Sequence, residues 1–254
     1  MAEYYETPEL GAWLHEPELI REPGRWLVCV HGISRNAREQ LVAFKPVADA
    51  LGIRLIAPNF CTQRFPGYQR LDQRPGHDRA DLALNRLLLQ LDPTCPQPRL
   101  DLFGYSGGAQ FSHRYALCYP RRVRSLMLAA AGWYTFPDSN VRYPRGLAAW
   151  PEALPQPAAQ ARQFLSIPTL ITIGSLDTQR DASLRRGERI DHQQGRTRLE
   201  RAQRWFEYCR SLGAGTDWQL EQLEGVGHSF ADSIAETRLL HLITHFLQSQ
   251  QENS

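Results

Sequence analysis

The stretch at residues 100–108, which reads LDLFGYSGG, decides how the rest of the sequence is interpreted. Its first four residues form an apolar run typical of a buried strand, and residues 107–119 form a helical pattern. A serine between glycines at a strand-to-helix junction matches the pattern Gly-x-Ser-x-Gly. The dinucleotide-binding order Gly-x-Gly-x-x-Gly and the P-loop pattern are both absent. We therefore predict a strained turn that exposes the hydroxyl of Ser106 as a nucleophile, in preference to an ordinary glycine-rich connection.

Apolar runs alternate with amphipathic stretches on both sides of this turn. The runs predicted as strands cover residues 26–30, 54–57, 100–103, 125–130, 169–173 and 218–223. The stretches predicted as helices cover residues 37–51, 78–91, 107–119, 198–212 and 234–247, with Pro46 expected to bend or interrupt the first. Strands that alternate with helices pair in parallel and carry helices on both faces of the sheet. The predicted fold class is α/β, with a mostly parallel central sheet and one domain over residues 1–254.

Residues 134–167 interrupt this alternation. The segment contains Pro137, Pro144, Pro151, Pro155 and Pro157 and shows little strand pattern. It follows the carboxyl end of one predicted strand and precedes the next. We predict a small cap or lid insertion over the functional site.

The residues just after the predicted strands are the candidates for chemistry, because ligands of parallel sheets bind beyond the carboxyl ends of the strands. His228 follows the last strand in the glycine-rich loop GVGHSF, and we predict that it is the base. Asp177 follows the preceding strand in GSLD, and we predict that its carboxylate orients the imidazole. Asp181 and Asp138 remain alternatives for the acid.

The first predicted strand ends in His31-Gly32-Ile33-Ser34, which suggests the second half of an oxyanion site. A backbone N–H from this loop joins the N–H after the nucleophile in such sites. We assign the two donors to Ile33 and Gly107. A structural role is predicted for His31, with its ring bracing the loop.

Composition excludes several other classes of function. The chain has 254 residues and a net charge of +2, with no basic stripe of the kind that nucleic-acid binding needs. No apolar stretch is long enough to span a bilayer, and no signal-peptide pattern is visible. The five cysteines show no CxxC or zinc spacing. We expect a soluble, cytoplasmic protein without a nucleic-acid partner or a membrane span.

The motifs HGIS, GYSGG, GSLD and GVGH occur in the order and spacing of the α/β-hydrolase superfamily, which the chain resembles from Gly24 to Leu247. The segments HGISRNAREQ and RFPGY are also similar to bacterial esterases and to polyhydroxyalkanoate depolymerase-like proteins. The resemblance implies a mostly parallel sheet and a serine hydrolase. Its triad would be Ser106, Asp177 and His228, and its oxyanion site Ile33 and Gly107.

The expected reaction is acyl transfer through Ser106, which cleaves a small-molecule carboxylic ester without a cofactor or a metal ion. A thioesterase or peptidase on the same triad and a non-catalytic binding protein remain alternatives. Aromatic residues after strand ends are expected to line an apolar substrate pocket. The candidates are Phe65, Tyr68, Trp133 and Tyr134.

Overall fold

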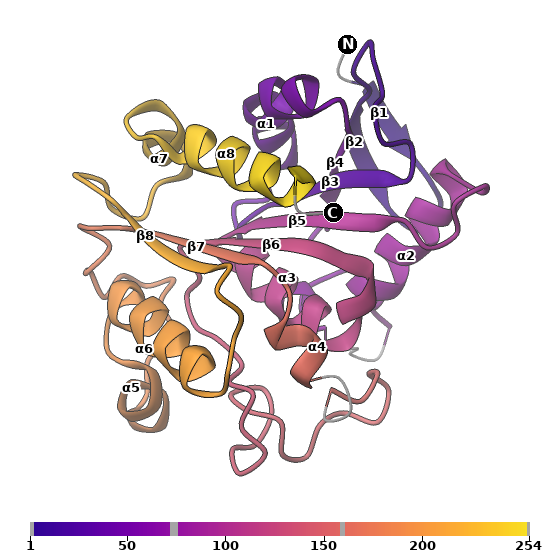
Figure 1. Cartoon of the computed structure of the whole chain (residues 1–254). Coiled ribbons are helices and arrows are strands. Elements are labelled where there is room, and N and C mark those ends of the chain that lie inside the picture. The colour runs from indigo at the N-terminus through magenta and orange to yellow at the C-terminus, as the bar shows by residue number, and fades with distance from the viewer. Residues whose placement is uncertain (1–2, 72–75, 158–160, 253–254) are drawn as a thin grey trace.

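The computed structural model describes residues 3–71, 76–157 and 161–252, and a central sheet organises them (Figure 1). The sheet in this part of the chain has eight strands in the order β1-β2-β4-β3-β5-β6-β7-β8. Strands β3 to β8 run parallel, whereas β1 and β2 are antiparallel to their neighbours. The strands are β1 (Glu3–Glu6), β2 (Gly11–His15), β3 (Arg25–Val30), β4 (Arg54–Asn59), β5 (Arg99–Tyr105), β6 (Val123–Ala129), β7 (Thr169–Gly174) and β8 (Trp218–Leu223).

The six strands predicted from apolar runs are therefore confirmed as the parallel part of the sheet. The β1–β2 hairpin was not predicted. β1 (EYYE) alternates no apolar residues with polar ones and lies at the sheet edge with mostly exposed residues, and β2 (GAWLH) contains an apolar run of only three residues. An edge strand needs no apolar face on both sides, so its sequence carries little signal.

Helices cover both faces of the sheet, as expected for the α/β class. Figure 1 shows α1 and α8 on one face and α3 and α6 on the other. The helices are α1 (Ala37–Leu51), α2 (Ala80–Leu91), α3 (Gly107–Cys118), α4 (Ala161–Leu165), α5 (Glu188–Gln194), α6 (Arg198–Ser211), α7 (Phe230–Ala235) and α8 (Leu239–Glu252). Two short 3₁₀ helices, η1 (Tyr68–Arg70) and η2 (Pro120–Arg122), lie in connections.

Two helix predictions need correction. Pro46 lies inside α1 and does not interrupt it. The single helix predicted at residues 234–247 is two helices, because Ser229 caps a separate helix α7: its side chain accepts a hydrogen bond from the N–H of Asp232. This cap starts a helix directly after His228.

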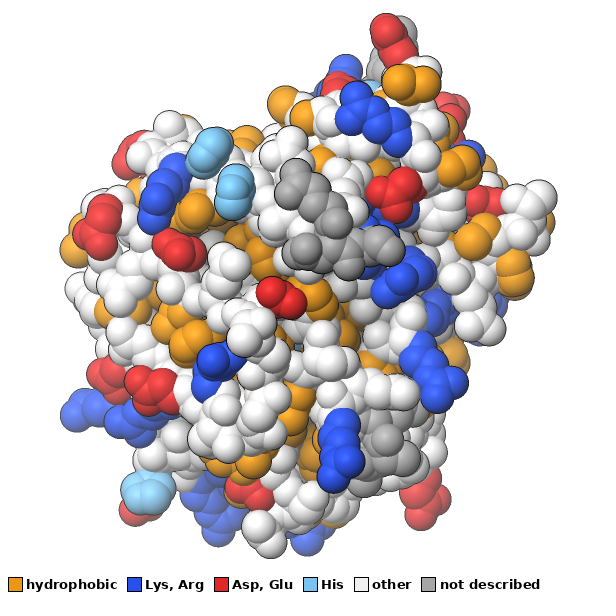
Figure 2. Space-filling model, viewed as in Figure 1, with side chains coloured by type: hydrophobic (Ala, Val, Ile, Leu, Met, Phe, Trp, Pro, Cys, Tyr) orange, Lys and Arg blue, Asp and Glu red, His pale blue; other side chains and the backbone are white. Residues whose placement is uncertain are grey.

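The core lies along the central strands. Every residue of β3 and of β7 is buried, as expected for strands covered on both faces. On the outside, Figure 2 shows acidic and basic side chains interspersed over one face of the molecule. Within the described residues, we find no helix with the length and apolar character needed to cross a membrane.

Candidate active site

Ser106 lies at the turn between β5 and α3, where the backbone is strained. Its φ of 53° is in the left-handed region, which a non-glycine residue rarely adopts. The close approach of α3 to the sheet depends on Gly108, where a Cβ atom would overlap the carbonyl oxygen of Val30. The sequence LFGYSGG therefore folds locally as predicted, with a serine held at the carboxyl edge of the sheet.

The predicted triad residues meet at this edge. The Ser106 Oγ atom lies 3.0 Å from Nε2 of His228, and Nδ1 of His228 lies 2.8 Å from Oδ2 of Asp177. Because a carboxylate only accepts hydrogen bonds, Nδ1 carries the proton, and Nε2 is left to accept from the serine hydroxyl. The Ser106–His228 distance is within the reach that a nucleophile and its base need for proton transfer, and the second hydrogen bond fixes the orientation of the imidazole.

The structure also distinguishes the three candidate acids. Asp177 is buried and bonds to His228, whereas Asp138 accepts a hydrogen bond of 2.8 Å from the N–H of Asn140 in its own turn. Asp181 accepts hydrogen bonds of 2.7 and 3.0 Å from Arg198. These bonds hold the pKa of the Asp181 carboxyl well below its usual range. Of the three, only Asp177 is hydrogen-bonded to the imidazole within the described chain.

Arg198, which sequence reasoning missed, lies behind this acid. It is the first residue of α6, it is only 1% exposed, and its Nη1 donates to Oδ1 of Asp177 at 3.2 Å. Nη2 donates to the hydroxyl of Ser183 at 2.6 Å. The guanidinium thus holds the face of the Asp177 carboxylate opposite His228. In a sequence, an arginine at the start of a helix looks like an ordinary surface residue. Only its position after the GSLD motif could have indicated that Arg198 contacts Asp177.

The predicted oxyanion residues lie beside the serine. An added Cβ at Gly32 would be 3.5 Å from Cβ of Ser106, which places the HGIS loop against the nucleophile. The N–H of Ile33 makes no hydrogen bond within the described chain. Gly107 is the first residue of α3, where a backbone N–H has no partner in the helix and the helix dipole favours negative charge. Both groups are suited to stabilise a developing oxyanion.

His31 fixes the conformation of this loop. Its Nδ1 donates to the carbonyl of Gly32 at 2.8 Å, and its Nε2 accepts from the N–H of Phe60 at 3.0 Å. Burial lowers the pKa of His31 to about 4, so the ring is neutral and can accept at Nε2. The hydroxyl of Tyr68 donates to the carbonyl of His31 at 2.9 Å.

A pocket of about 240 Å³ opens at Ser106. Trp133 lines it, as predicted, but Phe65 and Tyr134 do not. Both are buried in the core, where Phe65 packs on Phe60 and Tyr134 stacks on Trp205 with ring centroids 4.5 Å apart. The described lining residues are Ile33, Gln69, Arg70, Ser106, Gln110, Gly132, Trp133, Ala182, Ser183, Leu184, Arg185 and Arg198.

The expectation of an aromatic, apolar pocket therefore needs correction. Phe65, Tyr68 and Tyr134 are buried in the core, and the pocket has a mixed lining in which Trp133 is the aromatic residue among the described lining residues. Tyr68 is also buried, and its hydroxyl would be 2.6 Å from an added Cβ at Gly107. The described residues of the predicted cap at 134–167 do not line this pocket, so a lid function for the segment remains a prediction.

The remaining histidines offer no metal site within the described residues. No group of three or more His, Cys, Asp or Glu side chains there is arranged to hold a metal ion. His241 and His245 are four residues apart on α8, and both are exposed.

A sequence model of the family described as alpha/beta hydrolase fold matches residues 25–224. The chain belongs to the α/β-hydrolase family. Membership supports a hydrolase activity, and the match includes Ser106 and Asp177 but ends before His228. No curated protein sequence is significantly similar to this α/β-hydrolase.

Several solved structures share the α/β-hydrolase architecture. Poly(aspartic acid) hydrolase-1 from Sphingomonas sp. KT-1 is 26% identical, with a TM-score of 0.78 over 95% of this chain and 98% of that one. LpqC, a poly(3-hydroxybutyrate) depolymerase from Bordetella parapertussis, is 24% identical, with a TM-score of 0.75 over 96% and 88%. An S-formylglutathione hydrolase from Agrobacterium tumefaciens is 16% identical, with a TM-score of 0.59 over 97% and 94%.

Proposed function

We propose that this protein is a serine hydrolase that cleaves a carboxylic ester through a covalent acyl-enzyme on Ser106. The observation that carries the proposal is the continuous hydrogen-bonded relay from Ser106 through His228 to Asp177. Its three members come from loops far apart in the sequence and converge at one strained turn.

In the first half of the reaction, Oγ of Ser106 attacks the ester carbonyl while Nε2 of His228 takes the hydroxyl proton. The N–H groups of Ile33 and Gly107 donate to the oxyanion of the tetrahedral intermediate. Asp177 stabilises the imidazolium that forms. The C–O bond of the ester then breaks, and the alcohol leaves with the proton from His228.

In the second half, water attacks the acyl-enzyme and gives its proton to His228. The bond to Oγ of Ser106 breaks, the serine regains its proton, and the carboxylic acid leaves. Each oxyanion donor typically contributes about 3 kcal/mol to transition-state stabilisation.

A thioesterase or a peptidase would use the same residues with a different leaving group. A non-catalytic binding protein is less well supported. A strained serine costs about 1–3 kcal/mol of folding free energy, and a protein that only binds gains nothing from that strain.

A labelling experiment and a matched substrate panel test the proposal together. A fluorophosphonate probe should label the native protein and fail to label Ser106→Ala. Oxygen ester, thioester and amide substrates with the same acyl group should show the oxygen ester cleaved fastest by kcat/KM. A native, folded protein that never labels would support the binding protein, and fastest cleavage of the thioester or amide would move the activity to that class.

A further inference from the structure

The charged residues that line the pocket beside Ser106 are all basic. Arg70, Arg185 and Arg198 line it, and no acidic residue is among the described lining residues. In about 240 Å³, any bound acyl or leaving group lies close to these side chains. What each arginine can offer a substrate therefore depends on whether its charge is already paired.

The positive charge of Arg198 is largely balanced by two carboxylates. Its two terminal nitrogens donate to Asp177, Asp181 and Ser183. Its Nε atom is buried and has no hydrogen-bond partner within the described chain. Arg198 therefore leaves one unused donor in a pocket-lining residue.

Arg185 differs, because its charge faces no carboxylate. Its side chain makes no ion pair or hydrogen bond with another described residue, and the residue is exposed. Its guanidinium carbon lies 5.2 Å from the ring centroid of Trp133, which also lines the pocket. Such stacking orients a guanidinium without using its N–H donors.

Trp133 is itself held in place by a second arginine. The guanidinium of Arg114 lies 4.4 Å from the same ring centroid, and its nitrogens donate to Thr135 and to the carbonyls of Gln69 and Gln110. Arg114 is buried, so the ring rests on a fixed group. Arg185 is thus stacked on a rigid surface at the pocket wall.

We infer that this site selects substrates that carry a carboxylate near the scissile carbonyl, and that Arg185 is the residue that binds it. The inference rests on the proposed function, since it names the substrate class of the same site. Planar guanidinium groups bind carboxylates through two parallel hydrogen bonds, so the free N–H groups of Arg185 fit this ligand. The side-chain amides of Gln69 and Gln110, also in the lining, add uncharged donors.

A pair of substrates that differ only in charge tests the inference. Monomethyl glutarate carries a free carboxylate, and methyl glutaramate has a neutral amide of the same size in its place. We expect native kcat/KM to be at least about tenfold higher for the anion, because a hydrogen bond to a charged group is that much stronger than one to a neutral group. Monomethyl succinate and monomethyl adipate, each compared with the corresponding amide, define the preferred distance between the carboxylate and the ester carbonyl.

Two variants locate the effect. Arg185→Gln should reduce the anion-to-amide ratio by about tenfold, and raised salt should reduce the native ratio by screening. Arg186→Gln is the matched control, because it removes the same charge from the next residue, which does not line the pocket. It should leave the ratio unchanged. An equal fall in both variants would indicate a general field of the loop and overturn the role of Arg185.

The outcomes separate this inference from the proposed function. If both esters are cleaved at equal rates, the hydrolase proposal stands and the carboxylate preference is wrong. If neither is cleaved, calorimetric binding of the two compounds to Ser106→Ala decides. Tighter binding of the anion there would keep the inference without the ester function, and equal or undetectable binding of both would end it.

Discussion

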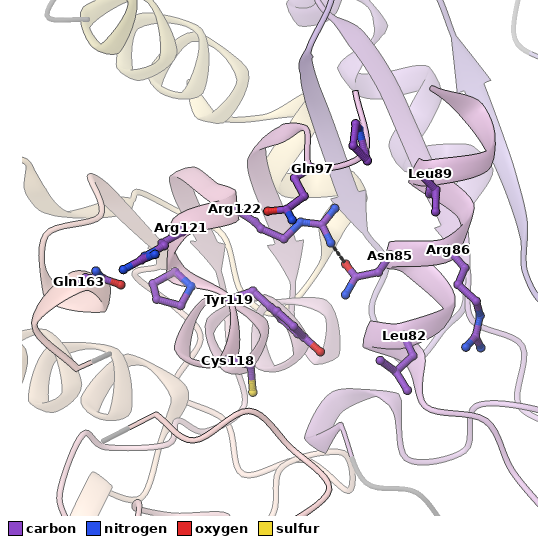
Figure 3. A pocket seen from close by; sticks show the side chains of 12 residues that line it. Leu82, Asn85, Arg86, Leu89, Gln97, Cys118, Tyr119, Arg121, Arg122 and Gln163 are labelled. Atoms are coloured by element: carbon purple, nitrogen blue, oxygen red, sulfur yellow. Dashed lines mark hydrogen bonds between the residues drawn. The ribbon is translucent and has the colours of Figure 1, made fainter. Parts of the chain in front are cut away.

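The small pocket at Ser106 and a larger groove at the other end of α3 make an instructive comparison. The groove measures about 760 Å³ against about 240 Å³ for the pocket. The two are separated by the length of α3, whose 12 residues span about 18 Å. Figure 3 shows the lining residues of the groove, with Leu82 and Leu89 of α2 on one side and Arg121 and Arg122 of η2 across from them.

The polar side chains of the groove and those at the pocket differ in the interactions that they make. In the groove, Nη1 of Arg122 donates to Asn85 at 2.5 Å, Arg86 pairs with Glu9, and burial raises the pKa of the Cys118 thiol. Arg86 is thus paired and the Cys118 thiol is held protonated, while Nε and Nη2 of Arg122 have no hydrogen-bond partner within the described chain. At the pocket, the strained Ser106 is hydrogen-bonded to the imidazole of His228, which is hydrogen-bonded in turn to the carboxylate of Asp177. Convergence of reactive groups, and not volume, is the reason for proposing that the chemistry takes place at Ser106.

The sharpest test of this contrast is Ser106→Ala. Removing a triad nucleophile lowers kcat by about 10⁶-fold, so activity on a cleaved ester should fall to the level supported by binding and the oxyanion site. Purified variant and native protein are compared by kcat/KM and by circular dichroism. Residual activity within tenfold of native would place the chemistry elsewhere, including the larger groove.

The next effect in size concerns the acid. Asp177→Asn keeps the shape of the side chain but favours the wrong imidazole tautomer, a change that costs about 10⁴-fold in a comparable triad. Asp138→Asn, in a local turn, should leave kcat/KM unchanged, and Asp181→Asn should lower it by less than about tenfold. A larger loss from Asp181→Asn than from Asp177→Asn would reverse the assignment made from the hydrogen bonds.

These two predictions use residues that the sequence proposes as candidates, with Asp177 as one of three possible acids, and the reason is geometric. Parallel strands bring their carboxyl ends to one edge, so Ser106, Asp177 and His228 were predictable as the polar residues after three apolar runs. Each lies next to a glycine-rich turn that is visible in the sequence. Choosing Asp177 over Asp181 and Asp138 needed the side-chain hydrogen bonds of the structure.

The pocket lining was less predictable, because it depends on which side chains point inward. Tyr134 and Trp133 are adjacent in the sequence, yet one stacks in the core and the other lines the pocket. Arg185 and Arg198 reach the pocket from a connection and from the start of α6, positions where arginine is ordinarily solvated. The periodicity of apolar residues predicts which face of a helix or strand is buried. It does not predict which side chains from different loops lie close together.

Arg198→Met should give the third effect, on stability and activity together. Removing one partner of a buried ion pair costs about 3–5 kcal/mol. Because Asp177 keeps its bond to His228, we expect a loss near 3 kcal/mol in the free energy of unfolding, with kcat/KM down by about 10- to 100-fold. Urea denaturation and steady-state kinetics measure the two losses. Arg204→Met, an exposed arginine on the same helix, should change neither.

The smallest effect is expected in the larger groove. Leu89→Ser and Arg121→Gln change two of its exposed residues, and surface substitutions of this kind alter stability by less than about 0.5 kcal/mol. Neither residue contacts the triad, so kcat/KM should stay within twofold of native for both monomethyl glutarate and methyl glutaramate. Kinetics on the double variant check this most stringently. A loss of tenfold or more in kcat/KM in a folded double variant would show that the groove affects the reaction across α3. The larger volume of the groove would then have been a correct indicator of function.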